Sequence, residues 1–468
     1  MSGPRTVSRR LAEHASGVRF AQLPAAAVRA AKWSLLDLIG VCLAASRSGE
    51  GCGAFAAVAL AGGAGPAPLI GRRAGVSALA AALANGALAH ALDFEDAYDA
   101  APVHPTAAAV PALLALAAGR RGTTGTDMLT ALATGTDLAC RLALALEESP
   151  ESRGWYPPPL FSAQGAATAC AHLLGLTADR FIDAWSLTLC SCNCSSEFKR
   201  TPDSTLRAVR EGLAARAGLE SALLAGAGAR GFDEPFEGRA GLYALYAGGQ
   251  YHEGRLLDGL GRDFEGARVS YKLYPSCRGT HPYIEAGLRL HRSGIAAEQI
   301  DEVILYGHPL MRMLFEPEAH KRSPANAIDA KFSAPYCFAH ALIHGALTLD
   351  SFDPASLRAP AALALAARVR FVPMDGLPLH AMSGGRTEIR LRDGGDWSCS
   401  IEHLRGSPAD PLSESELIDK FRDCAARARE PLPDSAVSRL IDVVLRLEDV
   451  TDLEGTLFDA LRGGMNAA

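Results

Sequence analysis

The sequence has few aromatic residues, which make up 6% of its 468 residues, although 49% of the residues are hydrophobic. Much of the hydrophobic content is alanine, which favours closely packed helices and is uncommon in strands. The composition therefore predicts a mainly helical protein and argues against a large antiparallel sheet. Because the chain exceeds the usual size of one domain, we expect at least two structural units.

A long apolar segment and an excess of charge of one sign are also missing. The apolar stretch 106–119 falls short of the roughly 20 residues that span a bilayer, and it contains Pro111. Acidic and basic residues are interspersed and the net charge is -6, which leaves no basic surface for nucleic acid or an anionic membrane. We therefore expect a protein that binds a small molecule, with neither nucleic acid nor a membrane as partner.

No cysteine pattern indicates a disulfide framework or a zinc site. The 11 cysteines are scattered, and Cys190, Cys192 and Cys194 alternate without the paired spacing of zinc ligands. Buried packing is the ordinary role of such side chains. Since Met1–Arg10 does not lead into an apolar signal segment, we expect reduced thiols and a cytoplasmic location.

One glycine motif has the spacing of a dinucleotide-binding loop, Gly226-Ala-Gly228-Ala-Arg-Gly231. It follows an apolar helix and ends in a loop, whereas the dinucleotide fold needs a strand before the glycines and a helix after them. We therefore expect no organic cofactor and no metal.

Helical periodicity dominates from about residue 25 to 246, with Pro24 and Pro105 placed for first helical turns and Thr177 for the start of another helix. After Gly261 the pattern becomes strand-like, and the sequence Asp-Gly-Gly-Asp at 393–396 is a hairpin signal. The predicted strands are 269–274, 300–306, 369–372, 387–392 and 397–402.

Helical periodicity returns at 413–427, 434–447 and 453–461, so the chain is expected to rejoin its first domain. The sequence thus predicts a large helical domain formed by residues 1–265 and 410–468. A smaller α+β domain, residues 266–409, is inserted between them.

Acid and imidazole side chains gather where one apolar helix ends and another begins. Asp93, Glu95 and Asp96 follow His90, and His104 directly precedes the second helix. This combination suits proton transfer, and the amides of a helix N-terminus suit a substrate carboxylate. The alternative is that the acids are solvated or cap the helix and that His104 only precedes it.

Two further segments carry candidate site residues. Arg207 and Arg210 lie one helical turn apart and would clamp carboxylates bidentately, unless they form ordinary ion pairs with acids such as Glu211. Lys272 and His281 flank a proline turn that also holds Cys277. We favour His281 as an acid/base residue and Cys277 as a packing residue over a nucleophile–base pair.

In their order along the chain, these segments resemble the MmgE/PrpD family, and the resemblance covers most of the sequence. The first segment is His90-Ala-Leu-Asp93-Phe-Glu95-Asp96 with His104-Pro-Thr106. The second is Lys272–His281, which resembles the family pattern KxxPxCxxxH, and the third is Asp329-Ala-Lys331-Phe332-Ser333-Ala-Pro-Tyr336, which resembles its AKFS block. The last is Arg405-Gly-Ser-Pro-Ala-Asp-Pro-Leu followed by Lys420-Phe421.

The resemblance implies a large helical domain made from both chain ends, an inserted α+β lid and a homodimer. Relatives include 2-methylcitrate dehydratases, cis-aconitate decarboxylases and iminodisuccinate epimerases, which change a bond or proton next to a carboxylate. Carried over by motif, the site would comprise Asp93, His104, Lys272 and His281 between the two domains. Arg207 stands where relatives commonly carry an active-site lysine.

The sequence departs from the family pattern at several of these positions. Ala97 replaces a common threonine, Glu95 a common aspartate, Arg207 a lysine, and Arg210 a histidine of some relatives. Because a guanidinium fork and an ammonium bind carboxylates with different geometry, the identity of the substrate stays open.

The reaction that this pattern favours begins with removal of a proton next to a carboxylate, which builds enolate-like negative charge. We assign His104 and His281 to proton transfer, Asp93 to orienting a histidine or a substrate hydroxyl, and Arg207, Arg210 and Lys272 to carboxylate binding. The first choice is a dehydratase of the 2-methylcitrate type acting on a small polycarboxylate. An epimerase, a decarboxylase and a catalytically silent binding protein are the alternatives.

Overall fold

A computed structural model describes residues 6–201, 204–377 and 383–463. The chain divides into a helical unit, Met1–Ala91, Glu95–Tyr271 and Ser413–Ala468, and an α+β unit, Leu92–Phe94 and Lys272–Leu412. The α+β unit thus begins and ends a few residues later than the predicted boundaries, and it gains one short segment near residue 93. Within the described ranges, no helix is long and apolar enough to cross a membrane.

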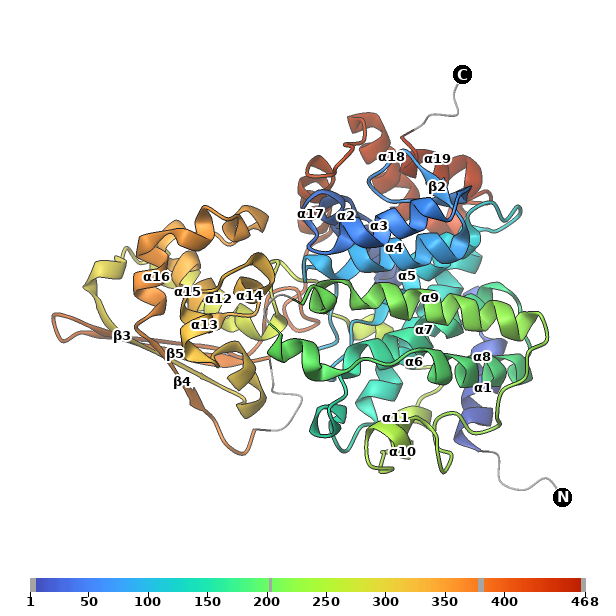
Figure 1. The fold of residues 1–468 in the computed structure, drawn as a ribbon, viewed down its shortest axis with the longest axis horizontal. Helices are drawn as coiled ribbons and strands as arrows, with labels where there is room; N and C mark the ends of the chain where they lie inside the picture. The colour runs from blue at the N-terminus through green and yellow to red at the C-terminus, as the bar shows by residue number, and fades with distance from the viewer. Residues whose placement is uncertain (1–5, 202–203, 378–382, 464–468) are drawn as a thin grey trace. The chain divides into compact units, whose positions relative to one another are not determined.

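The helical unit contains the long helices of the chain and a two-stranded ribbon, β1 (Ala64–Pro68) with β2 (Gly75–Val76). Its helices lie side by side in Figure 1. They are α1 (Val7–Gly17), α2 (Ala25–Ser48), α3 (Cys52–Ala61), α4 (Ala78–Ala91), α5 (Pro105–Ala117), α6 (Gly125–Leu144), α7 (Pro157–Leu173), α8 (Ala178–Ser191), α9 (Leu206–Gly226), α10 (Leu242–Tyr246), α11 (Glu253–Leu257), α17 (Glu414–Ala426), α18 (Asp434–Leu445) and α19 (Asp459–Leu461).

Small residues let the central helices of this unit approach closely. A Cβ atom added to Gly86 of α4 would lie 2.8 Å from the Cα of Gly212 in α9, and one added to Gly212 would lie 2.3 Å from the carbonyl oxygen of Leu83. Since such contacts leave no room for a side chain, glycine is required on both helices. This crossing fixes the position of the first turns of α9 relative to the end of α4.

The two ends of the chain meet in the helical unit. Phe421 of α17 contacts Gly40 of α2, where an added Cβ would lie 2.9 Å from the phenyl ring. A buried ion pair joins Lys420 Nζ to Asp37 at 2.7 Å, and Lys32 binds Glu448 at 2.8 Å. The predicted fold class, a helical domain built from both chain ends with an inserted smaller α+β domain, is confirmed.

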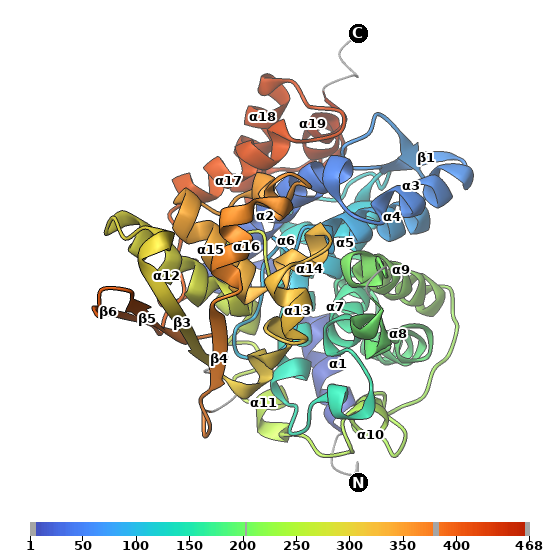
Figure 2. The ribbon, with the colours of Figure 1, turned by 60° about the vertical axis from the view of Figure 1, so that its left-hand side comes forward.

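The α+β unit is built on a four-stranded sheet of order β4-β3-β5-β6, which is seen obliquely in Figure 2. Only the β3–β4 pair is parallel, and β5–β6 is the predicted hairpin. Tyr283 of α12 packs beside Gly307 and Gly385 of the sheet. The elements are α12 (His281–Arg292), β3 (Ile300–Gly307), α13 (Glu318–Arg322), α14 (Ala327–Lys331), α15 (Ala334–His344), α16 (Pro360–Ala366), β4 (Val369–Pro373), β5 (Gly385–Leu391) and β6 (Asp396–Ile401).

Some local predictions are wrong. Residues 269–274 form no strand, because only Ser270 pairs, in an isolated bridge with Ala97, and the Tyr271 hydroxyl instead donates to the Ala30 carbonyl at 3.1 Å. Pro24 is the N-cap of α2 and not a first-turn residue. The segment predicted as a helix at 453–461 is helical, but its first part is a π-helix, Glu454–Phe458, followed by the short α19.

Candidate active site

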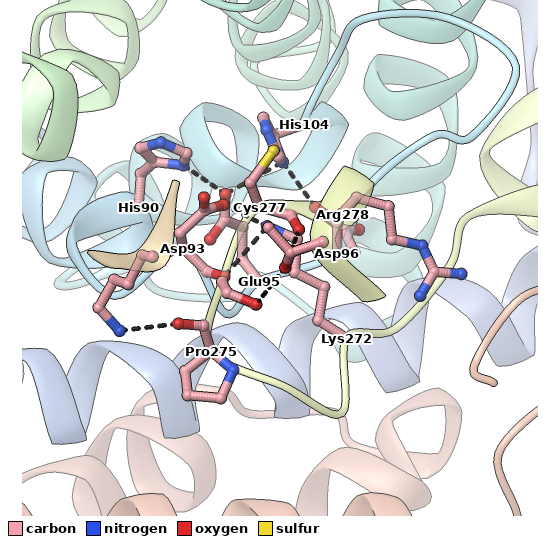
Figure 3. A network of polar contacts seen from close by, with 12 residues as sticks. His90, Asp93, Glu95, Asp96, His104, Lys272, Pro275, Cys277 and Arg278 are labelled. Atoms are coloured by element: carbon pink, nitrogen blue, oxygen red, sulfur yellow. Dashed lines mark hydrogen bonds and ion pairs between the residues drawn. The ribbon is translucent and has the colours of Figure 1, made fainter. Parts of the chain in front are cut away.

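Two histidines and a glutamate meet where α4 ends and α5 begins. Both His90, in the last turn of α4, and His104, the N-cap of α5, direct Nδ1 at the same oxygen of Glu95. The His104 distance is 3.0 Å, and the imidazole centroids are 5.0 Å apart. His90 and Glu95 are fully buried, whereas the His104 side chain is 15% exposed. Figure 3 shows the three groups together, and of these His104 is the one with an exposed part that a ligand could reach.

The protonation state of the His104 ring follows from a second contact. Its Nδ1 lies 2.9 Å from the backbone carbonyl oxygen of Asp96, which can only accept a hydrogen bond. Nδ1 therefore carries the proton in the neutral ring, and Nε2 is the nitrogen without a proton. This is the arrangement that a general base requires, and the imidazolium is its conjugate acid.

Two more buried carboxyl groups lie near Glu95. Burial, with smaller contributions from Asp37 and Glu95, raises the pKa of Asp96 to about 7, although Thr106 and Ser34 donate hydrogen bonds to it. Burial, with Glu95 as a smaller cause, also raises the pKa of Glu211 to about 7 and outweighs the opposite effect of Arg210. The buried acidic groups around Glu95 therefore favour protonation of one another and of nearby groups.

Glu211→Gln should make stability less dependent on pH. With a pKa of about 7 against an ordinary 4.5, the folded chain binds this proton more tightly than the unfolded chain. The contribution is therefore fully present below pH 4.5, and the free energy of unfolding falls as pH rises from about 4.5 to 7. Glutamine keeps the oxygen that accepts from Ser162 and does not titrate. We expect a smaller decrease of Tm between pH 5 and pH 8 in the variant than in the unmodified protein.

Thermal unfolding at several pH values provides the measurement. Glu220→Gln is the matched control, because Glu220 is on the same helix, pairs with Arg216 at 3.5 Å and is 43% exposed. The control should leave the slope unchanged. An equal slope in Glu211→Gln and the unmodified protein would contradict the prediction.

The predicted arginines lie at the start of α9, beside two aromatic rings. The Arg210 guanidinium is 4.6 Å from the centre of the Tyr156 ring, and that of Arg207 is 5.5 Å from the centre of Phe198. Lys199 Nζ is 4.8 Å from the same Tyr156 ring. Burial lowers the pKa of Lys199, and the positive charges of Arg207 and Arg210 lower it further, whereas its partner Glu151 opposes the shift. Three cations thus lie together, an arrangement that suits a ligand with negative charge.

Arg210 also has partners within the protein, as expected if it forms an ordinary ion pair with Glu211. It is 1% exposed, donates to the Arg207 carbonyl oxygen, and lies 3.7 Å from Glu211. Arg207 is more accessible than Arg210. Arg207 is therefore the better placed of the two to contact a substrate.

Within the α+β unit, Asp93 and Lys272 form a buried ion pair. Lys272 Nζ contacts a carboxylate oxygen of Asp93 and donates to its carbonyl oxygen at 3.1 Å; both side chains are almost completely buried (Figure 3). Asp93 has a φ of 49°, and in the part of the chain that the structure describes no other residue except glycine has a positive φ. Such a conformation is unfavourable for most side chains and often marks a functional position.

His281, at the start of α12, has contacts at both ring nitrogens. Its Nε2 lies 3.3 Å from the Ser276 carbonyl oxygen and its Nδ1 3.3 Å from an Arg278 nitrogen, so the ring donates at Nε2 and accepts at Nδ1. Burial holds the pKa of His281 well below its ordinary value, and Arg278 and Lys272 add to this effect. Its proposed proton transfer stays a prediction, but this environment favours a neutral ring that positions Arg278.

The cluster at the α4–α5 junction also has the donor types of a metal site. His90, Glu95 and His104 each offer a ligand atom, and these atoms lie within 4.8 Å of one another. Imidazole nitrogens with a carboxylate suit zinc or iron. However, direct hydrogen bonds between these groups already account for the arrangement, and we do not assign them as metal ligands.

The structure brings together some residues that the sequence analysis treats separately. In the helical unit, His104 is joined by Glu95 and His90, and Arg207 and Arg210 by Lys199 and Tyr156. In the α+β unit, Asp93 pairs with Lys272, and His281 contacts Arg278. His90 and Glu95 belong to the predicted proton-transfer cluster without a role of their own, whereas no sequence signal points to Lys199 or Tyr156. Only the proximity of His90 and Glu95 to Asp93 in the chain signals part of this set.

Comparisons with known proteins agree with this arrangement of motifs. The model of the MmgE/PrpD N-terminal domain matches residues 9–254, and that of the MmgE/PrpD C-terminal domain matches residues 274–449. A cis-aconitate decarboxylase-like protein of Aspergillus oryzae is 28% identical over 81% of this chain and 81% of its own length. Human cis-aconitate decarboxylase is 26% identical over 80% of this chain and 77% of its own. Cis-aconitate decarboxylase of Aspergillus terreus is 26% identical over 81% and 80%.

Proposed function

The chain belongs to the MmgE/PrpD family and is an enzyme, and we propose that it is a cofactor-independent lyase acting on a small polycarboxylate. The observation that carries the proposal is His104, an accessible histidine whose protonated Nδ1 is held by a carbonyl and a carboxylate. Such a residue can take up a proton next to a carboxylate or return one. The neighbouring cations of α9 suit the carboxylates of the substrate.

Decarboxylation of a cis-aconitate-like tricarboxylate is the reaction that we favour. Its support is the match to cis-aconitate decarboxylases over about four-fifths of the chain. In such a reaction the C–C bond to the leaving carboxylate breaks, its electrons shift through the double bond, and a carbon atom accepts a proton. We assign delivery of that proton to the imidazolium of His104.

Dehydration of a 2-methylcitrate-like acid is the second candidate. It needs the reverse role of the same group, because neutral His104 removes the proton next to a carboxylate before hydroxide leaves as water. The tautomer of His104, with its proton on Nδ1 and a basic Nε2, supports that reaction. The two candidates therefore need opposite protonation states of His104 at the start of the chemical step.

Incubation with a panel of polycarboxylates in heavy water, followed by NMR, tests the proposal. Release of carbon dioxide with one deuterium in the product identifies decarboxylation, whereas loss of the hydroxyl group identifies dehydration. Deuterium exchange without a change of skeleton identifies an epimerase, the remaining alternative. Binding of these acids without turnover or exchange would contradict the proposed enzyme activity.

We expect activity to survive removal of metal ions. His90, Glu95 and His104 are hydrogen-bonded to one another, which accounts for their position without a metal. The measurement is turnover after dialysis against a chelator, with the metal content determined before and after. A stoichiometric metal whose removal abolishes activity and whose return restores it would contradict the prediction.

Arg207→Ala should impair turnover far more than folding. We propose that Arg207 binds a substrate carboxylate, and a charge-assisted contact of this kind contributes about 1.5–3 kcal/mol. This corresponds to a loss of roughly tenfold to more than a hundredfold in kcat/KM. Arg216→Ala is the matched control, because Arg216 lies on the same helix and is 47% exposed. Unchanged kinetics in Arg207→Ala would remove this residue from the site.

A further inference from the structure

Glu95 lies between two imidazoles that the fold holds in place from different helices. We infer that Glu95 is a positioning residue, which fixes the tautomer and orientation of His104 while His90 holds Glu95 itself. The inference rests on the proposed function, since it names the groups that prepare His104 for proton transfer.

The contacts of Glu95 with His90 and His104 show which groups donate hydrogen bonds and which accept them. One Glu95 oxygen contacts Nδ1 of His90 and lies 3.0 Å from Nδ1 of His104. A carboxylate only accepts, so both imidazoles present N–H groups to it. The Asp96 carbonyl oxygen reinforces the same tautomer of His104 at 2.9 Å. His104 Nε2 is thereby left as the nitrogen that exchanges a proton.

The three members differ in accessibility, which separates their roles. His90 and Glu95 are fully buried, and only His104 has an exposed part. Since His104 alone of the three has an exposed part, we place it against the substrate, and His90 and Glu95 act through it. Carboxylates that orient a ligating or catalytic histidine in this way select its tautomer and stabilise the imidazolium.

Several other acidic groups surround Glu95, whose carboxylate lies 3.0 Å from His104 Nδ1. Glu95 contributes to the raised pKa values of Asp96 and of Glu211 on α9, and to that of the Cys42 thiol on α2. Asp37 acts on Asp96, and Arg210 acts on Glu211. His90 and His104 are the groups whose hydrogen bonds to Glu95 balance these repulsions.

Glu95→Gln tests the inference, because glutamine keeps the shape of the side chain and removes its charge. We expect kcat to fall about 10- to 100-fold, less than the roughly 10²–10⁴-fold that a general acid or base contributes, with KM changed less than about twofold. The limb of the pH–rate profile due to His104 should move down by about one pH unit, as loss of a neighbouring negative charge destabilises the imidazolium. Glu95→Asp, which keeps the charge, should restore part of kcat and the position of this limb.

A second readout does not depend on the substrate. Nitrogen-15 NMR of labelled histidines should show His104 protonated at Nδ1 in the unmodified protein and a lower midpoint of its ring titration in Glu95→Gln, with Tm measured alongside. If no polycarboxylate reacts, the proposed function fails, but this spectrum still tests the positioning role. Wild-type kcat and pH profile in Glu95→Gln, or an unchanged midpoint of the His104 ring titration, would overturn the inference.

Discussion

Replacement of His104 by alanine is expected to reduce kcat/KM by about 10²-fold or more, with little change in Tm. This is the range for loss of a general acid or base. The imidazole is the accessible member of its cluster and is held by Glu95 and the Asp96 carbonyl group. Alanine removes the group that exchanges the proton but leaves the Glu95–His90 contact intact. Steady-state kinetics give kcat/KM, and thermal unfolding of the same preparation gives Tm.

The pH dependence of the unmodified enzyme then identifies the reaction. If His104 must deliver a proton, as in decarboxylation, kcat falls as pH rises through the pKa of its imidazolium. If it must remove a proton, as in dehydration, kcat falls as pH decreases through that pKa.

His281→Ala and His252→Ala complete this experiment. Since both nitrogens of His281 are engaged, we expect this variant to retain the pH profile even where turnover falls. His252 is 60% exposed and serves as the neutral control. Near-normal turnover in His104→Ala, or loss of the pH limb in His281→Ala, would transfer the proton-exchange role away from His104.

Lys272→Met is expected to reduce both stability and activity. The substitution leaves the Asp93 carboxylate buried without the ammonium group that neutralises it, and breaking one side of a buried ion pair costs about 3–5 kcal/mol. It also removes a cation that we propose for carboxylate binding. This cation is paired with Asp93, so a substrate carboxylate would compete with that partner.

A double variant separates the two effects. Lys272→Met combined with Asp93→Asn removes both charges and should recover part of the lost stability but none of the activity. Lys420→Met is the matched control, because it breaks the buried Lys420–Asp37 pair and should destabilise the protein while sparing kcat. Recovery of turnover together with Tm in the double variant would show that Asp93 and Lys272 serve stability alone.

Local pattern was sufficient for most of the architecture. The hairpin around residues 393–396 and Pro105 at the first turn of α5 are decided by neighbouring residues, and both appear where the sequence predicts them. The segment 269–274 shows the limit of such reasoning. Its β-branched and aromatic residues suit a strand, but apart from the isolated Ala97–Ser270 bridge it finds no partner strand.

By itself, the sequence determined the fold class, the family motifs and the candidate residues Asp93, His104, Arg207, Arg210, Lys272 and His281. It did not determine which of them meet. Lys272 and Asp93 are 179 positions apart, and Glu211 acts on the acid cluster only because Gly86 and Gly212 let α4 and α9 cross closely. The roles of Glu95 and His90 likewise depend on contacts at one carboxylate oxygen. Hydrogen bonds and pKa shifts depend on groups that lie a few ångströms apart in space, whereas sequence patterns show only neighbours along the chain. Tertiary packing decides which distant residues come within that range.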